Sequence, residues 1–225
     1  MYFKNRADAG RQLAKKLLRY RTSNVAVVAL SRGSMIIGAQ VAMKLHGSLS
    51  MLLTRDILLP GEHEAIAAVS SAGTYTQNHG FSAGELEQLT MDYRSFIEEA
   101  RREAMHEMNM LVSHDGEIKK DYLRNHVVVV VADGFQNGFS LDVVADYFKT
   151  IAIKKLVVAT PVASVKAVDR MHLVADEICC LDVKPNFIGI DHYYDENTIP
   201  SNIEGLLKVQ KHISLNWKIE PIVNR

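Results

Sequence analysis

The sequence has few features of a secreted, membrane-embedded or nucleic-acid-binding protein. It holds only two cysteines among 225 residues, the adjacent pair Cys179 and Cys180, and two neighbouring cysteines in an apolar run do not make a disulfide framework. The 26 basic and 26 acidic side chains cancel, so no excess charge attracts the chain to nucleic acid or to an anionic membrane. Any anion that it binds must be held by local geometry.

Long apolar runs are also absent. No stretch reaches the roughly 18 apolar residues that a membrane span needs, and the charged segment 4–21 lacks the form of a secretory signal. We therefore expect a cytoplasmic protein that contacts no membrane. With 48% apolar and 23% charged residues, the chain has enough material for a single domain with one sizeable core over residues 1–225.

Apolar spacing predicts helices and strands that alternate along the chain. Helices are expected over residues 8–20, 35–45, 85–113, 141–149 and 165–173, and strands over 25–30, 49–53, 65–71, 127–131, 156–160 and 177–181. The span 73–84 has no period of either kind and is predicted to be a mobile loop.

The strongest strand signal is the run of five consecutive valines at 127–131. A strand that is apolar on both faces suits the centre of a parallel sheet covered by helices on both sides. Together with the alternating elements, it predicts an α/β fold, specifically a Rossmann-like, doubly wound, mostly parallel sheet with a small hood or flap.

The turn after the valine strand, residues 133–140, is the strongest candidate for a ligand site. Ligands of open α/β sheets bind at the carboxyl ends of the strands. Gly138 allows the backbone to approach a ligand, the amides at the next helix N-terminus point outward, and Ser140 adds a hydroxyl donor, which together suit a phosphate monoester. Asp133 suits sugar hydroxyls, directly or through a divalent ion. The alternative is that these polar residues only cap a helix and fill a turn.

The stretch 127–140 resembles the PRPP-binding signature of type I phosphoribosyltransferases, in which an apolar strand ends in two acidic residues and a short Thr/Gly/Ser loop. Further segments follow the order seen in a branch of predicted phosphoribosyltransferases, and the resemblance covers roughly residues 3–195. These segments are Arg6-Ala7-Asp8-Ala9-Gly10, Leu30-Ser31-Arg32-Gly33-Ser34, Pro60-Gly61, 65–69, Arg101-Arg102, Thr160-Pro161-Val162, Ala175-Asp176-Glu177 and 187–194.

The resemblance implies a protein that binds PRPP or a nucleoside 5′-phosphate and transfers the phosphoribosyl group to a nitrogenous base with release of pyrophosphate, Mg²⁺ being carried by PRPP. Asp133 and Arg32 would be catalytic, and Asp133 would also hold the metal. Residues 72–95 would form the lid and 185–225 a hood and tail. The expected partner is a small sugar phosphate or nucleotide, with no nucleic acid and no membrane; a homodimer is compatible with it.

The resemblance also implies which residues contact each part of the ligand. The 5′-phosphate would lie against Gly134, Gln136, Asn137, Gly138, Phe139 and Ser140, the pyrophosphate against Ser31, Arg32, Gly33, Ser34 and Arg55, and the base against Phe187 and Tyr193.

Several residues depart from the family pattern, and the mildest departures are Ser31 and Ser34, which stand where Pro and Gly are more usual. Ala132 stands where the first acidic residue is expected, and Gln136 and Asn137 replace smaller residues in the phosphate loop. Asp56 lies beside Arg55 where it would repel pyrophosphate. These departures favour, as the alternative, a catalytically inactive ligand sensor or a regulatory or interaction protein on the same fold. A third candidate is an unrelated nucleotide-binding α/β domain, although no G-x-G-x-x-G turn follows residues 25–30 as a dinucleotide fold requires.

Overall fold

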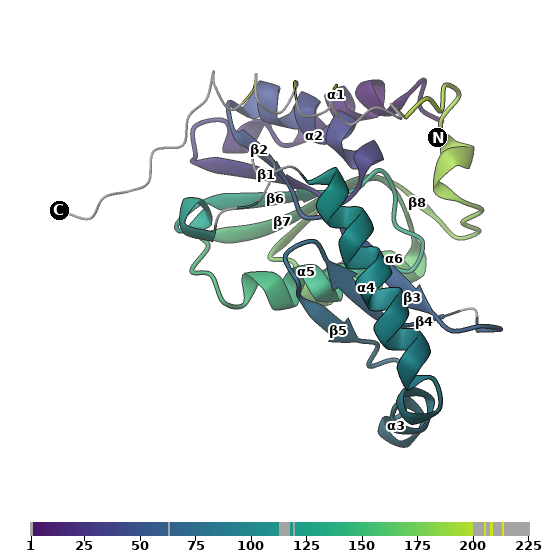
Figure 1. The fold of residues 1–225 in the computed structure, drawn as a ribbon. Helices are drawn as coiled ribbons and strands as arrows, with labels where there is room; N and C mark the ends of the chain where they lie inside the picture. Colours follow the sequence, from purple (N-terminus) through teal and green to yellow (C-terminus); the bar gives the residue numbers. More distant parts are fainter. Residues whose placement is uncertain are drawn as a thin grey trace.

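The main sheet of the protein has five strands, all parallel. The computed structural model describes residues 2–62, 64–112, 118, 120–199, 205, 208 and 213. The strand order is β2-β1-β6-β7-β8, which confirms the expected α/β fold (Figure 1). The order reverses between β1 and β6, the place where doubly wound sheets bind ligands. The strands are β1 Val25–Ala29, β2 Ser48–Met51, β6 Val127–Val131, β7 Lys155–Ser164 and β8 Glu177–Lys184.

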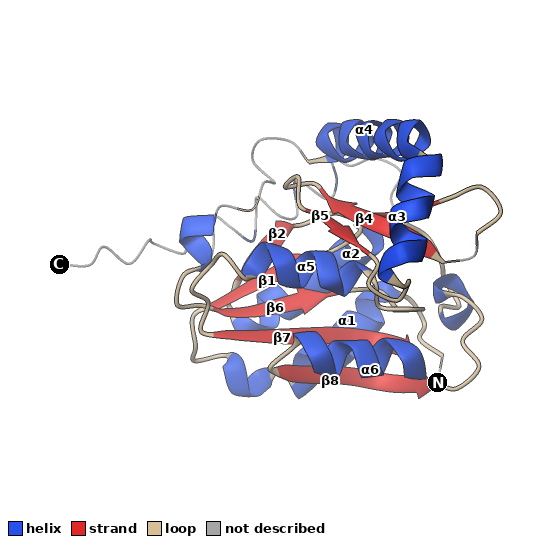
Figure 2. Ribbon diagram, turned by 90° about the horizontal axis from the view of Figure 1, so that it is seen from below, coloured by secondary structure: helices blue, strands red, loops and turns tan. Residues whose placement is uncertain are grey.

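Helices cover both faces of this sheet (Figure 2). Successive side chains of a strand point to opposite faces, and the valines of β6 divide accordingly. Val127, Val129 and Val131 share one core with α1 (Arg6–Lys16) and α2 (Arg32–Leu45). Val128 and Val130 share the other core with α5 (Ser140–Phe148) and α6 (Val165–Val174). All five valines are buried for this reason.

A second, antiparallel sheet of three strands lies beside the first, in the order β3-β4-β5. Two helices follow it in the chain, and α4 packs on it through Ile97, while Ala104 and Met108 reach the core of the main sheet. We call this unit the arm (Figure 1). Its elements are β3 Thr54–Leu58, β4 Ala65–Ser70, β5 Tyr75–Gln77, α3 Ala83–Asp92 and α4 Arg94–Leu111.

The arm corrects three sequence predictions. The span 73–84 is a loop only in part, because it contains β5 and the start of α3; a strand of three residues is too short to show alternation. The single helix expected over 85–113 is two helices that meet at Tyr93, whose backbone leaves the helical region at φ −111° and ψ 21°. The strand β3 was missed because charged Arg55 and Asp56 interrupt its apolar pattern.

Two helix boundaries also differ from the prediction. The first helix ends at Lys16 and is followed by a 3₁₀ turn, Leu18–Tyr20. The second begins at Arg32 rather than 35, because Ser31 caps it by accepting a hydrogen bond from the backbone N–H of Ser34. Residues 31–34 are therefore the first turn of α2 and not a loop before it.

The segment after β8 returns to the N-terminus. The backbone N–H of Phe3 donates to Tyr193 and that of Asp195 donates to Phe3, so these two stretches lie side by side. The segment includes a short 3₁₀ helix, Ile190–Tyr193. Most of the hood and tail predicted over 185–225 falls at positions 200–225, where only three residues are described. Across the described parts of the chain, no helix combines the length and apolarity needed to cross a membrane.

Candidate functional site

A cavity of about 370 Å³ opens at the carboxyl ends of β1 and β6. This is the switch point of the main sheet, where ligands of such sheets bind. One wall comes from β3 of the arm and the rest from the turns after β1 and β6 and from Ile190. The lining residues are Leu30, Ser31, Thr54, Arg55, Asp56, Ala132, Asp133, Gly134, Phe135, Ser140 and Ile190.

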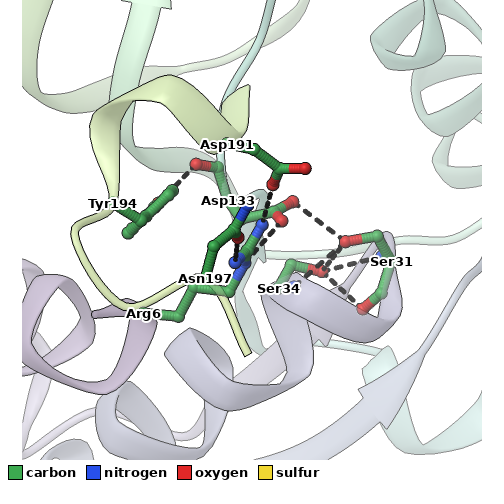
Figure 3. A network of polar contacts seen from close by, with 7 residues as sticks. All are labelled: Arg6, Ser31, Ser34, Asp133, Asp191, Tyr194 and Asn197. Carbon is green, nitrogen blue, oxygen red and sulfur yellow. Dashed lines mark hydrogen bonds and ion pairs between the residues drawn. The ribbon is translucent and has the colours of Figure 1, made fainter. Parts of the chain in front are cut away.

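Asp133 lies in this wall and is already paired within the protein (Figure 3). Its Oδ2 accepts a hydrogen bond of 2.9 Å from Nε of Arg6, and its Oδ1 accepts one of 3.0 Å from the hydroxyl of Ser31. The side chains of Arg6 and Asp133 are 2% and 10% exposed, so this is a buried ion pair. The carboxylate that the sequence analysis assigns to ribose therefore also anchors the N-terminal helix.

Arg6 joins Asp133 to the segment after β8 (Figure 3). Its Nη2 donates to Asp191 at 2.7 Å, and its Nη1 donates to the side chain of Asn197. Burial alone lowers the pKa of the Arg6 guanidinium, but the attraction of Asp133 and the hydrogen bonds to Asp191 and Asp133 outweigh it, so the pKa is raised. Arg6 therefore stays charged and holds three segments together.

Tyr194 completes this cluster. Its hydroxyl donates to the backbone carbonyl of Asp133 at 2.5 Å, and the guanidinium of Arg6 lies 4.6 Å from the centre of its ring. Burial, reinforced by the negative charge of Asp133, raises the pKa of Tyr194, which keeps its hydroxyl neutral and available as a donor. The hydroxyl thus fixes the backbone at the start of the turn 133–140.

Gly33 makes room for the Arg6–Asp133 pair. A Cβ built at Gly33 would lie 2.1 Å from Oδ2 of Asp133 and 2.7 Å from Nε of Arg6. Both atoms belong to the buried pair, so no flexible end of a side chain can give way. The glycine is required because the first turn of α2 passes directly over the ion pair.

The turn 134–140 has backbone amides that donate to no group among the described residues. In the described part of the chain, the N–H groups of Gln136, Asn137, Gly138 and Ser140 have no hydrogen-bond acceptor. Gly138 has φ +71°, a conformation that favours glycine. No side chain caps the N-terminus of α5. Open amides at a helix N-terminus suit an anion, and a phosphate best.

Most side chains of this turn make contacts that hold the turn in its own conformation. Oδ1 of Asn137 accepts from the N–H of Phe139 at 3.0 Å, and the carbonyl of Gln136 accepts from Ser164 at 2.5 Å. The ring of Phe139 is buried against β4 of the arm. Of the predicted phosphate residues, Gly134 and Ser140 line the cavity. The groups that this turn leaves open are therefore backbone amides rather than side chains.

The predicted pyrophosphate residues are divided. Ser31 lines the cavity, and Arg55 lines it while pairing with Glu107 of α4 at 2.7 Å. Ser34 is buried and caps α2 together with Ser31. Arg32 is exposed on α2 and is not part of the lining. The two predicted cations are therefore not brought together at the cavity.

The predicted base residues lie next to each other but do not line the cavity. The rings of Phe187 and Tyr193 are 5.2 Å apart. The hydroxyl of Tyr193 accepts from the N–H of Ile188 and donates to the carbonyl of Asn186. These hydrogen bonds stabilise the loop to which Tyr193 belongs. Ile190, from the same loop, is the residue that reaches the cavity.

The residues at the cavity do not form a protein-held Mg²⁺ site. In the described residues, no group of three or more His, Cys, Asp or Glu side chains is placed to hold a metal ion. Both oxygens of Asp133 already accept hydrogen bonds, and Arg6 offsets its charge. A divalent ion at Asp133 would have to compete with a guanidinium, so direct ligation by this carboxylate does not fit.

Comparison with known proteins supports the resemblance found in the sequence. No family model matches the chain. Two proteins of Mycobacterium tuberculosis, from strains CDC 1551 and H37Rv, each carry the name "Putative phosphoribosyl transferase" and are 28% identical to the chain over 207 residues. The resemblance to phosphoribosyltransferases is confirmed. The match covers 90% of this chain but 45% of those relatives, so the chain spans less than half of their length.

One solved structure resembles the whole fold. The protein TT1426 from Thermus thermophilus superposes with a TM-score of 0.67 and is 24% identical; the match covers 96% of this chain and 99% of that one. The likeness shows that main sheet and arm occur together in another protein.

Proposed function

We propose that the chain is a phosphoribosyltransferase-like protein that binds PRPP or a nucleoside 5′-phosphate in the cavity. The observation that carries the proposal is the turn 134–140, which has open amides before α5 and lines the cavity beside Asp133 through Gly134 and Ser140. A phosphate at these amides is met by hydrogen bonds and by the positive end of the helix dipole. The attached ribose would then face Ser31 and Asp133. A cytoplasmic location belongs to the same proposal.

The chain's own residues would bind and orient the ligand. The amides of the turn would hold the 5′-phosphate, and Ser31 would donate to or accept from a ribose hydroxyl. Leu30, Phe135 and Ile190 line the cavity with apolar groups, which would exclude water from the anomeric carbon. In phosphoribosyl transfer, Mg²⁺ supplies charge neutralisation for pyrophosphate, and here it would arrive on the ligand's phosphates. Residues 72–95, which contain β5 and α3, remain our candidate for a lid.

The second candidate function is a ligand sensor on the same fold that does not turn its ligand over. Ala132 leaves Asp133 as the only carboxylate of the usual pair, and Arg6 already binds it. Arg55 is paired with Glu107 rather than free. These pairings support binding more strongly than catalysis, because transfer requires groups that stabilise the departing charge.

The test is a titration of the purified chain with PRPP and Mg²⁺, with ribose 5-phosphate in parallel. The melting temperature reports binding, since a ligand of the folded state raises it by mass action. Pyrophosphate release with a mixture of purine and pyrimidine bases reports turnover. Ser140→Ala should weaken the stabilisation modestly, because it removes a hydroxyl that lines the cavity beside the open amides, whereas Ser95→Ala, at an exposed position on α4, should leave it unchanged.

The outcomes separate the two candidates. Stabilisation with pyrophosphate release identifies a transferase, and stabilisation without release identifies a sensor. An absence of stabilisation by any of these ligands would overturn the proposal as a whole.

A further inference from the structure

Asp56 is a cavity residue whose charge is at odds with a phosphate ligand and which forms no hydrogen bond or ion pair among the described residues. It lies on β3 and lines the cavity beside Arg55. No hydrogen bond or ion pair joins its carboxylate to any other described residue. Burial raises the pKa of Asp56 and so favours its neutral form, and the nearby charge of Arg170 partly opposes this; the carboxylate is therefore fully charged only well above its ordinary pKa.

None of the described cations near Asp56 forms an ion pair with it. Arg55 pairs with Glu107 at 2.7 Å, on the side of α4. Arg170 donates to both carboxylate oxygens of Asp142, the shortest contact being 2.5 Å. Arg6 is shared by Asp133 and Asp191. The β3 side of the cavity therefore carries the carboxylate of Asp56, which is in no ion pair among the described residues, beside Arg55, which is paired with Glu107.

This arrangement fixes the direction in which a ligand fits. With a 5′-phosphate at the turn 134–140 and the ribose beside Ser31 and Asp133, the remaining polar wall of the cavity is residues 54–56. The rest of the lining, Leu30, Ala132, Phe135 and Ile190, is apolar. A substituent on the anomeric carbon would thus face Thr54, Arg55 and Asp56.

We propose that the cavity selects monophosphates of ribose or of a nucleoside over ligands that carry a diphosphate, and that Asp56 is the selecting residue. This inference rests on the proposed function and narrows its ligand class. A diphosphate brings at least two negative charges next to a carboxylate that is in no ion pair with a described cation, whereas a hydroxyl or a base amino group can donate to the same carboxylate.

The experiment compares ribose 5-phosphate with PRPP by calorimetric titration of the full chain. Wild type should bind ribose 5-phosphate at least about tenfold more tightly than PRPP in EDTA, where the ligand keeps its full charge. Asp56→Asn keeps the shape of the side chain and should reduce the difference in affinity between ribose 5-phosphate and PRPP. Asp56→Lys should make PRPP the tighter ligand. The affinity for ribose 5-phosphate should change by less than about threefold in Asp56→Asn. Excess Mg²⁺ should reduce the preference, because it neutralises part of the diphosphate.

Matched controls use Asp92, which is exposed on α3, a helix with no buried residues. Asp92→Asn and Asp92→Lys make the same changes in net charge and should leave the wild-type preference intact. If PRPP binds wild type as tightly as ribose 5-phosphate, or if Asp56→Asn does not alter the ratio, the inference is wrong while the proposed function stands. If neither ligand binds wild type, both fail.

Discussion

At the scale of single residues, the contact of Gly33 with the Arg6–Asp133 pair determines the geometry of the candidate site. Gly33→Ala should lower the free energy of unfolding by about 1–3 kcal/mol, since the new methyl group overlaps Asp133 and must displace the pair. Gly84→Ala is the control, because Gly84 lies in α3 with no atom within 4 Å of its added Cβ. Gly84→Ala should raise the free energy of unfolding by up to about 1 kcal/mol. Urea denaturation measures both; equal effects would contradict the prediction.

The buried ion pair itself makes a second prediction at this scale. Arg6→Met leaves Asp133 charged and buried without its cation. This should lower the free energy of unfolding by about 3–5 kcal/mol. Asp133→Asn should lower the free energy of unfolding by less, because Arg6 keeps its hydrogen bond to Asp191. The double variant should recover much of the Arg6→Met loss, since the uncompensated charge is then gone. A double-mutant cycle in urea measures this coupling, and strictly additive losses would show that the two residues act independently.

The sequence identified one member of this pair and missed the other. Asp133 was chosen because a polar residue after a central strand lies at the ligand-binding edge of a sheet. Arg6 was noticed only as part of a motif, because nothing in local spacing indicates that a residue 127 positions away will lie at 2.9 Å. A charged residue among helical apolar positions was the available signal, and buried arginines require a partner. The pairing was therefore beyond the reach of local pattern.

At the scale of elements, Arg170 on α6 connects the arm to the main sheet. It binds Asp142 on α5, reaches the side chain of Asn78 at 3.4 Å, and lies 4.9 Å from the ring centre of Phe139, which packs on β4. Arg170→Met should lower the free energy of unfolding by about 1.5–3 kcal/mol, because Asp142, whose side chain is mostly buried, would lose its charged partner. Amide hydrogen exchange should accelerate in β4 and β5.

Lys166 provides the matched control on the same helix. It pairs with Glu64 of the arm at 2.6 Å, but both side chains are more than half exposed. An exposed pair contributes little, so Lys166→Met should cost less than about 1 kcal/mol and leave exchange in the arm unchanged. If the two substitutions have the same effect, the arm is held by its apolar contacts rather than by Arg170.

The elements that the sequence predicted best are those with strong, uninterrupted patterns. The five strands of the main sheet and its helices were located because buried parallel strands read as continuous apolar runs. The arm was located only in part. Neither charged β3 nor the three residues of β5 carry a strand period, and no glycine or proline marks the break at Tyr93. These features are set by tertiary contacts, which local propensity does not encode.

At the scale of the whole molecule, the two sheets share one core. Val69 of β4 and Ala104 and Met108 of α4 belong to the same buried cluster as the valines of β1 and β6. Elements that share a core lose their contacts together. We therefore predict that the arm and the main sheet unfold in one cooperative transition, with equal calorimetric and van't Hoff enthalpies. Two resolved transitions would instead identify the arm as a separate folding unit.

The position of the cavity extends this prediction to the bound state. Its lining combines Thr54, Arg55 and Asp56 of the arm with residues from the turns of the main sheet. A ligand held there stabilises both units at once, so saturation at about 100 times the dissociation constant should add about 2.7 kcal/mol to the single transition and shift it without splitting it. Far-ultraviolet circular dichroism during heating, with ribose 5-phosphate added, measures the shift. A ligand that moved only part of the transition would bind to one unit alone and would place the site outside this cavity.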